Sequence, residues 1–223
     1  MSQTEVSGSL RLSADELDDL IYFTRAGDAD ELKNTITTIA TSHTSTLERI
    51  ISTAIDIDPE DPASSSGCSL LHWAAANNHV EILKYFLQTI NATAASSEKL
   101  IKPRVGGLVN HQNSLGNTPL HWAALNGHME CVKLLVYAGA DPSIQNAAGK
   151  DAVFEGERGE VNKNGPPKEE EEKQGAEEKT TKEVGVVEWL LENCEGLDQG
   201  FGGVDEGEAS EPQQNSEKMD VDG

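Results

Sequence analysis

The chain has 223 residues and a formal net charge of −22, from 39 Asp and Glu against 17 Lys and Arg. A surface this acidic repels nucleic-acid phosphates and attracts cationic proteins, so we expect no direct nucleic-acid binding. The sequence has no apolar run long enough to cross a bilayer and no secretory signal pattern, so we expect a soluble intracellular protein without membrane contact. The three widely spaced cysteines predict reduced thiols: Cys68, Cys131 and Cys194.

The first part of the chain is predicted to hold two helices. Residues 1–11 are expected to be a flexible N-terminus. A helix is predicted over 12–24, because Ser13 and Glu16 have the spacing of a capping box. A second helix is predicted over 29–40.

Residues 41–66 are interpreted as a long connector. One or two helical turns packing back on the first helices are predicted by four aliphatic residues: Leu47, Ile50, Ile51 and Ile55. The Asp-, Pro- and Ser-rich remainder, from Asp56 onward, predicts an exposed acidic loop.

The stretch 113–146 predicts a turn, a helix, a second turn and a second helix. Thr118 is placed to cap the first helix, and Pro119 falls at its first position, where a missing N–H costs nothing. Gly127 and Gly139 are placed to end the two helices.

This stretch has repeats on both sides. Residues 67–87 align with it at a constant offset of 49, and the extra length predicts a loop insertion at about 91–109. A third copy begins at Gly149, 33 residues after Gly116, with Asp151 in the place of the capping threonine.

The last copy is interrupted. Residues 159–182 are rich in charge, Gly and Pro and are expected to be a disordered insertion, because they cannot bury enough apolar surface to offset their ordering entropy. Residues 184–191 then restore the missing second helix, and 196–223 are expected to be a disordered acidic tail. Four consecutive glutamates are candidates for shielding a basic partner: Glu169, Glu170, Glu171 and Glu172.

The run Thr118-Pro119-Leu120-His121-Trp122-Ala123 and the turns around it resemble an ankyrin repeat. The resemblance implies an all-α ankyrin-repeat solenoid of about four repeats with β-turn connections, within a domain spanning 12–195. One repeat cannot bury its own apolar face, so the first helices are expected to form a capping repeat.

Four of the six histidines occupy two repeat-equivalent positions, and we interpret them as structural bonds between adjacent turns: His72, His79, His121 and His128. Their spacing fits no zinc site, so neither a metal nor a cofactor is expected. No nucleophile–base set or phosphate-binding loop stands out from the repeats, so we expect no enzyme.

Trp73 and Trp122 directly follow a repeat histidine. They either pack helix against helix or form neighbouring aromatic platforms on a groove floor. The candidate groove residues are Trp73, Ala76, Asn77, Asn117, Trp122, Leu125, Asn126, Glu155 and Arg158, with Ser114 and Leu115 at a turn tip beside them.

The long insertions, the start Arg25-Ala26-Gly27-Asp28, the run Asp151-Ala152-Val153-Phe154-Glu155 and the acidic end resemble the fungal ankyrin-repeat chaperones of a KH-domain ribosomal protein. The resemblance implies a monomer that binds one newly made basic small-subunit ribosomal protein, keeps it soluble in cytoplasm and nucleus, and releases it on the pre-ribosome. The alternatives are a generic ankyrin adaptor in signalling or transcription and a regulatory subunit of a kinase or phosphatase.

Overall fold

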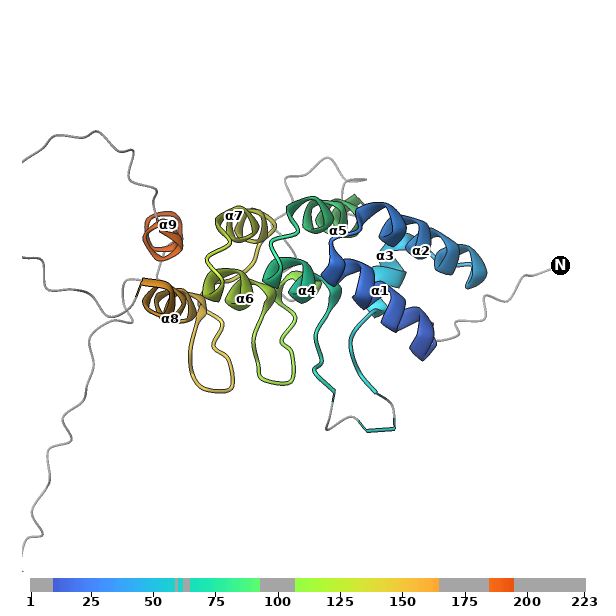
Figure 1. Ribbon diagram of the computed structural model, residues 1–223, viewed down its shortest axis with the longest axis horizontal. Helices are drawn as coiled ribbons and strands as arrows, with labels where there is room; N and C mark the ends of the chain where they lie inside the picture. Colours follow the sequence, from blue (N-terminus) through green and yellow to red (C-terminus); the bar gives the residue numbers. More distant parts are fainter. Residues whose placement is uncertain (1–9, 59, 62–64, 93–106, 165–184, 195–223) are drawn as a thin grey trace, which may run out of the picture.

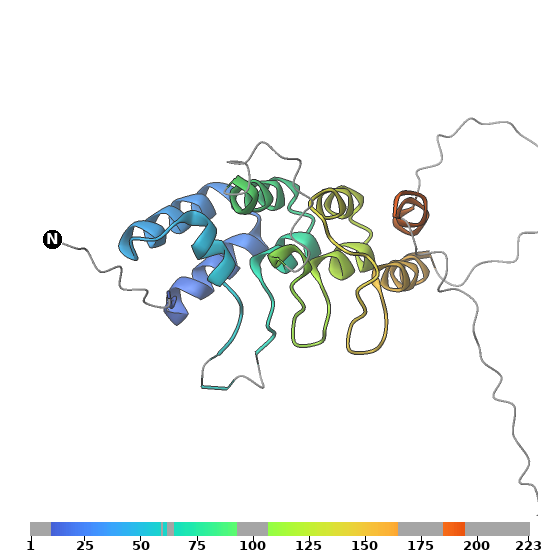
Figure 2. The same cartoon turned by 180° about the vertical axis from the view of Figure 1, so that it is seen from behind.

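The computed structural model describes residues 10–58, 60, 61, 65–92, 107–164 and 185–194. These residues form two layers of helices (Figures 1 and 2). An inner layer holds α1 (Ala14–Ala26), α4 (Leu70–Ala76), α6 (Pro119–Leu125) and α8 (Ala152–Asn164). An outer layer holds α2 (Ala29–Ser42), α5 (Val80–Ala92), α7 (Met129–Tyr137) and α9 (Val186–Asn193), with the short α3 (Leu47–Thr53) packed on α2 and α5. The predicted all-α repeat solenoid is confirmed.

Loops project from the inner layer on the side away from the outer helices (Figure 1). We call them the finger loops, and in the described part of the chain they comprise residues 54–58, 60, 61 and 65–69, then 111–118 and 141–151. In the described part of the chain the one isolated β-bridge pairs Ile55 with Ser69 at the base of the first finger loop. Backbone bonds join neighbouring finger loops, from Ser114 N–H to the Ser66 carbonyl and from Ala147 N–H to the Leu115 carbonyl, each 2.9 Å long.

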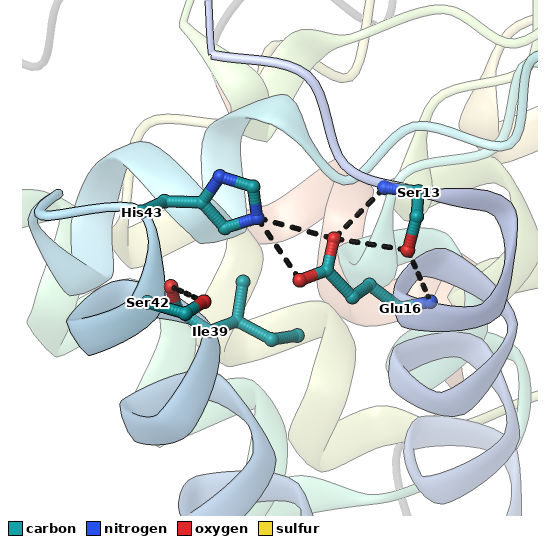
Figure 3. A network of polar contacts seen from close by, with 5 residues as sticks. All are labelled: Ser13, Glu16, Ile39, Ser42 and His43. Carbon is teal, nitrogen blue, oxygen red and sulfur yellow. Dashed lines mark hydrogen bonds and ion pairs between the residues drawn. The ribbon is translucent and has the colours of Figure 1, made fainter.

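The start of α1 follows the predicted capping box. The Ser13 N–H donates to the Glu16 carboxylate at 2.8 Å, and the Glu16 N–H donates to the Ser13 hydroxyl at 3.2 Å (Figure 3). The Ser13 N–H bond, the largest cause, holds the pKa of Glu16 below its ordinary value. Since a capping residue precedes its helix, α1 begins at Ala14, two residues after the predicted start. His43, at the end of α2, lies 2.9 Å from the same carboxylate and ties the two helices together.

The core lies between the two layers. Its largest fully buried side chains come from both layers and from α3: Leu20, Leu32, Ile36, Ile50, Ile51, Leu70, Leu71, Ile82, Leu83, Phe86, Leu120 and Leu135. Every repeat shares this apolar seam with its neighbours, as expected for a stack whose single units cannot bury their own faces.

The predicted loop at 91–109 is shorter than expected. Helix α5 continues to Ala92, and Leu108–Asn110 forms a 3-10 helix, η1, with Val109 buried. The Asn110 side chain donates to the Gly139 carbonyl at 3.1 Å and accepts from the Asp141 N–H at 2.9 Å. These bonds order the end of the insertion; residues 93–106 lie outside the described part.

The predicted start of the last insertion, at residue 159, is also wrong. Helix α8 continues to Asn164, because glycines let it approach α6 closely. A Cβ atom on Gly159 would lie 2.0 Å from the Leu125 carbonyl oxygen. The run Glu169–Glu172 and the tail 196–223 lie outside the described residues, as do residues 1–9.

We predict that Gly159→Ala destabilises the last repeat, because its methyl group would overlap the α6 backbone. The expected loss is about 1–3 kcal/mol of unfolding free energy, the usual cost of overpacking. Urea denaturation followed by circular dichroism measures it.

Gly156→Ala on the same helix is the matched control. Its Cβ atom would meet the Val187 side chain at 3.1 Å, and that side chain can yield. We expect a change within about 1 kcal/mol, because alanine also favours the helix by a similar amount. Equal destabilisation by both variants would contradict the close approach at Gly159.

Candidate functional site

Asparagines organise the turns of two finger loops. The Asn113 side-chain oxygen accepts from the N–H groups of Leu115 and Asn117, both at 3.0 Å. Asn146 repeats this geometry 33 residues later with Ala148 and Lys150, also at 3.0 Å. Such side-chain bonds stabilise tight turns without strand pairing, so each finger loop holds its shape.

His72 and His121 join each inner helix to the next finger loop. In each ring Nδ1 accepts the N–H of the capping residue, Ser69 at 3.2 Å and Thr118 at 3.1 Å. The other ring nitrogen, Nε2, bonds to a carbonyl oxygen of the following repeat: Asn117 at 2.8 Å for His72 and Lys150 at 3.0 Å for His121.

A carbonyl oxygen only accepts, so Nε2 carries the hydrogen. Nδ1 accepts an N–H and therefore carries none, so both rings are neutral. Burial, the largest cause, lowers the pKa of His72 to about 4 and lowers the pKa of His121 in the same direction. The two rings therefore act as fixed connectors between repeats.

The other two repeat histidines, His79 and His128, each bond to a carbonyl oxygen of the preceding repeat. His79 Nε2 lies 2.9 Å from the Arg25 carbonyl oxygen, and His128 Nε2 lies 3.1 Å from that of Ala76. The structural interpretation of the four repeat histidines is confirmed. In the part of the chain that the structure describes, no three His, Cys, Asp or Glu side chains gather as metal ligands.

The two central inner helices, α4 and α6, expose few side chains. Within α4 every residue is buried except Trp73 and Ala76, and within α6 every residue is buried except Trp122 and Leu125. These pairs are spaced three apart and therefore share one helix face. Of the predicted groove residues, Trp73, Ala76, Trp122 and Leu125 thus lie on the partly exposed faces of α4 and α6.

Trp73 and Trp122 pack against each other, as the structural alternative predicted, and their role as a platform for a partner stays a prediction. Their ring centroids are 5.4 Å apart at an interplanar angle of 77°, and the Trp122 ring also meets the His72 ring at 5.6 Å. This edge-to-face packing is favourable, and both indoles remain partly exposed. Trp73 and Trp122 therefore join two repeats and also line the inner surface.

Asn77 and Asn126 have a local structural role. Each side-chain amide donates to the tryptophan carbonyl four residues earlier, at 2.8 Å in the first case and 2.9 Å in the second. The same two carbonyls also accept the backbone N–H of Asn77 at 3.3 Å and of Asn126 at 3.2 Å, so the amides reinforce the ends of α4 and α6. The groove contact predicted for them stays a prediction.

A third aromatic residue extends the surface, and the sequence reasoning missed it. Gly27, Asn78 and Gly127 each end an inner helix in the left-handed conformation, with φ of 79°, 57° and 67°. Aligning the repeats on these residues places Tyr22 at the position of Trp73 and Trp122. Tyr22 is 66% exposed. We call Tyr22, Trp73 and Trp122 the aromatic row.

The last repeat ends the row with a charged pair. Glu155 stands 33 residues after Trp122, but it is 6% exposed and accepts from the Asn146 side chain at 3.1 Å. It also pairs with Arg158 at 3.0 Å. The same Asn146 amide reaches the Asn117 side chain at 2.8 Å. Glu155 therefore stabilises the last turn, and Arg158 is the exposed member of the pair.

The charge of this surface is uneven. The stretches 65–80 and 107–129, which include α4 and α6, contain no Asp, Glu, Lys or Arg. Exposed carboxylates lie instead on α1 and on the first finger loop: Asp15, Asp18, Asp19, Asp58, Glu60 and Asp61. A neutral aromatic centre with an acidic end suits a partner segment that is apolar in the middle and basic beside it.

We predict that acid weakens the fold through His72. The folded protein keeps this ring neutral down to a pKa of about 4, whereas an ordinary histidine takes a proton near 6.5. The stabilisation that comes from keeping His72 neutral is fully present above about pH 6.5. As the pH falls toward 4, the unfolding free energy drops progressively, by at most about 3 kcal/mol. Urea unfolding at a series of pH values measures the slope.

His72→Gln supplies the comparison for that measurement. The variant is less stable at pH 7, but its unfolding free energy should depend less on pH between 6.5 and 4.5. A slope identical to that of the wild type would show that His72 is not held neutral.

Comparison with known proteins agrees with this geometry. Residues 40–146 match the family described as ankyrin repeats, three copies. Over 148 residues the chain is 44% identical to the Ankyrin repeat-containing protein YAR1 of Saccharomyces cerevisiae, covering 66% of this chain and 64% of the yeast protein. This match spans less than two thirds of the length of that relative.

A solved structure is also similar. It is the crystal structure of the yeast ribosomal protein Rps3 in complex with its chaperone Yar1, which matches with a TM-score of 0.52 and 38% identity. The match covers 69% of this chain and 90% of the solved chain. With the repeat architecture described above, these similarities show that the chain belongs to the ankyrin-repeat family.

Proposed function

We propose that this protein is a dedicated chaperone of ribosomal protein Rps3 in its own organism. The observation that carries the proposal is the aromatic row on an uncharged surface with an acidic end, in a chain 38% identical to one solved in a complex of Rps3 with its chaperone. The protein would bind the newly made client one to one, keep it soluble and hand it to the pre-ribosome.

Charge and apolar contact would have separate tasks. A free ribosomal protein is a basic chain that aggregates and binds RNA indiscriminately. The net charge of −22 speeds encounter with such a chain and competes with phosphate for its Lys and Arg side chains. The aromatic row would give the contact its specificity, because aromatic anchors carry much of the energy of protein interfaces.

Release would need no nucleotide hydrolysis. Assembled rRNA presents a denser array of negative charge than the chaperone and would displace it from the client. The proposal makes the protein a binding partner without catalytic activity of its own, acting in both cytoplasm and nucleus. The Glu169–Glu172 run would contribute to shielding.

Affinity purification tests the proposed function. The tagged full-length protein is isolated from its own cells and washed with increasing salt. We expect one stoichiometric partner, the Rps3 counterpart, without the rest of the small subunit, and weaker retention at high salt. A signalling protein, or binding that is insensitive to salt, would favour the adaptor alternative. A kinase or phosphatase with an altered rate would favour the regulatory-subunit alternative.

We predict that Trp73→Ala combined with Trp122→Ala weakens Rps3 binding at least about 30-fold, the effect of losing an interface hot spot. Calorimetry with purified Rps3 measures it. Tyr137→Ala is the control, because Tyr137 is 76% exposed on the outer helix α7. Equal affinities for the double variant and the control would contradict the role of the tryptophans.

Leu125→Arg tests the same surface without removing the packed indoles. Leu125 is partly exposed on α6, so the variant should fold and place a bulky cation where the apolar segment of the client is expected. We expect binding to fall at least tenfold while the circular dichroism spectrum and the unfolding midpoint stay close to wild type. Unchanged binding by a folded variant would place the client elsewhere.

A further inference from the structure

The aromatic row already holds a cation from the chain itself. The Arg25 guanidinium carbon lies 4.9 Å from the centroid of the Trp73 ring. This distance is within the range at which a cation is attracted to the face of an indole. Arg25 lies near the end of α1, whereas Trp73 belongs to the next inner helix, α4.

The backbone of Arg25 is held in place by its neighbours, but its guanidinium group makes few contacts. Its carbonyl oxygen lies 2.9 Å from His79 Nε2, and Gly27, two residues on, packs so closely that a Cβ atom would lie 2.5 Å from the His79 ring. Among the residues that the structure describes, no carboxylate forms an ion pair with Arg25, which is an exposed residue. The contact that the structure shows for the Arg25 guanidinium, within the described residues, is therefore the face of the Trp73 ring.

The repeat alignment shows that this arrangement is particular to the first repeat. The same position is Ala76 in the second repeat, Leu125 in the third and Arg158 in the fourth. Arg158 is neutralised by Glu155 of its own helix. Arg25 thus sits at the junction between the acidic end of the surface and its neutral aromatic centre.

We propose that the Trp73 face is a subsite for a cationic side chain, which Arg25 fills in the free protein and a Lys or Arg of the client takes over in the complex. This inference rests on the proposed function. In the free chaperone the guanidinium covers an aromatic surface that would otherwise attract unrelated apolar chains. In the complex the subsite binds a basic residue of the client, which lies next to the apolar client segment that contacts Trp122 and Leu125.

An internal occupant competes with the client at a high effective concentration. Removing it should therefore tighten client binding, by about two- to fivefold for a cation–π contact at an exposed site. A residue that merely positioned Trp73 would have the opposite effect, since its removal would loosen the platform.

The test compares Arg25→Ala with Arg11→Ala in the full chain, by calorimetry with purified Rps3. Arg11 is exposed just before α1, so both variants remove one positive charge from the same end of the molecule. We expect Arg25→Ala to bind about two- to fivefold more tightly than Arg11→Ala. The gain should vanish when Trp73→Leu is added to each variant.

Three outcomes decide the matter. Failure of the wild-type chain to bind Rps3 overturns the proposed function itself. Binding by the wild type, with Arg25→Ala equal to or weaker than Arg11→Ala, leaves the function standing and overturns the subsite. A gain that persists without Trp73 also overturns it, because the effect would then be one of general charge.

Nuclear magnetic resonance of the Arg25 side chain supplies a direct second reading. Its δ protons should resonate upfield in the free protein, because they lie near the indole ring, and Trp73→Leu should abolish this shift. Saturating Rps3 should return them to the position of a solvent-exposed arginine. An upfield shift that persists in the complex would show that Arg25 keeps the subsite.

Discussion

The repeat histidine is the connection on which the rest of the structure depends. Its two ring nitrogens bond in different directions, one to the capping residue of its own helix and the other to a carbonyl of the next repeat. Both bonds require a neutral ring with its hydrogen on Nε2. Burial enforces that state at His72, whose pKa falls to about 4. Each inner helix is thereby held in register with the following finger loop.

This register determines what the inner surface can present. The residue after each histidine, Trp73 or Trp122, is directed to the same side of the stack, and Tyr22 continues the row in the first repeat. The middle of the surface is neutral, and carboxylates lie at the α1 end. Apolar recognition and electrostatic attraction therefore occupy different places, which suits a client with a basic surface beside an apolar segment.

Local signals made much of this predictable from sequence. The Ser13–Glu16 spacing and the Thr118–Pro119 pair place helix starts, because capping depends on neighbouring residues. Tyr22 was missed because the first repeat lacks both the Thr-Pro turn and the histidine that mark this position in the later repeats, although Gly27 can be aligned with Gly127 from the sequence. The length of α8 was underestimated because its support comes from tertiary contact at Gly159, which no local pattern records.

The central claim is that the inner surface, and not the outer helices, holds the client. Site-specific photo-cross-linking tests it directly, with a photoreactive amino acid replacing Leu125 on α6 in one sample and Tyr137 on α7 in another, each mixed with Rps3. The account predicts a cross-link to Rps3 from position 125 and none from position 137. A cross-link from position 137 alone would place the client on the outer layer and contradict the account.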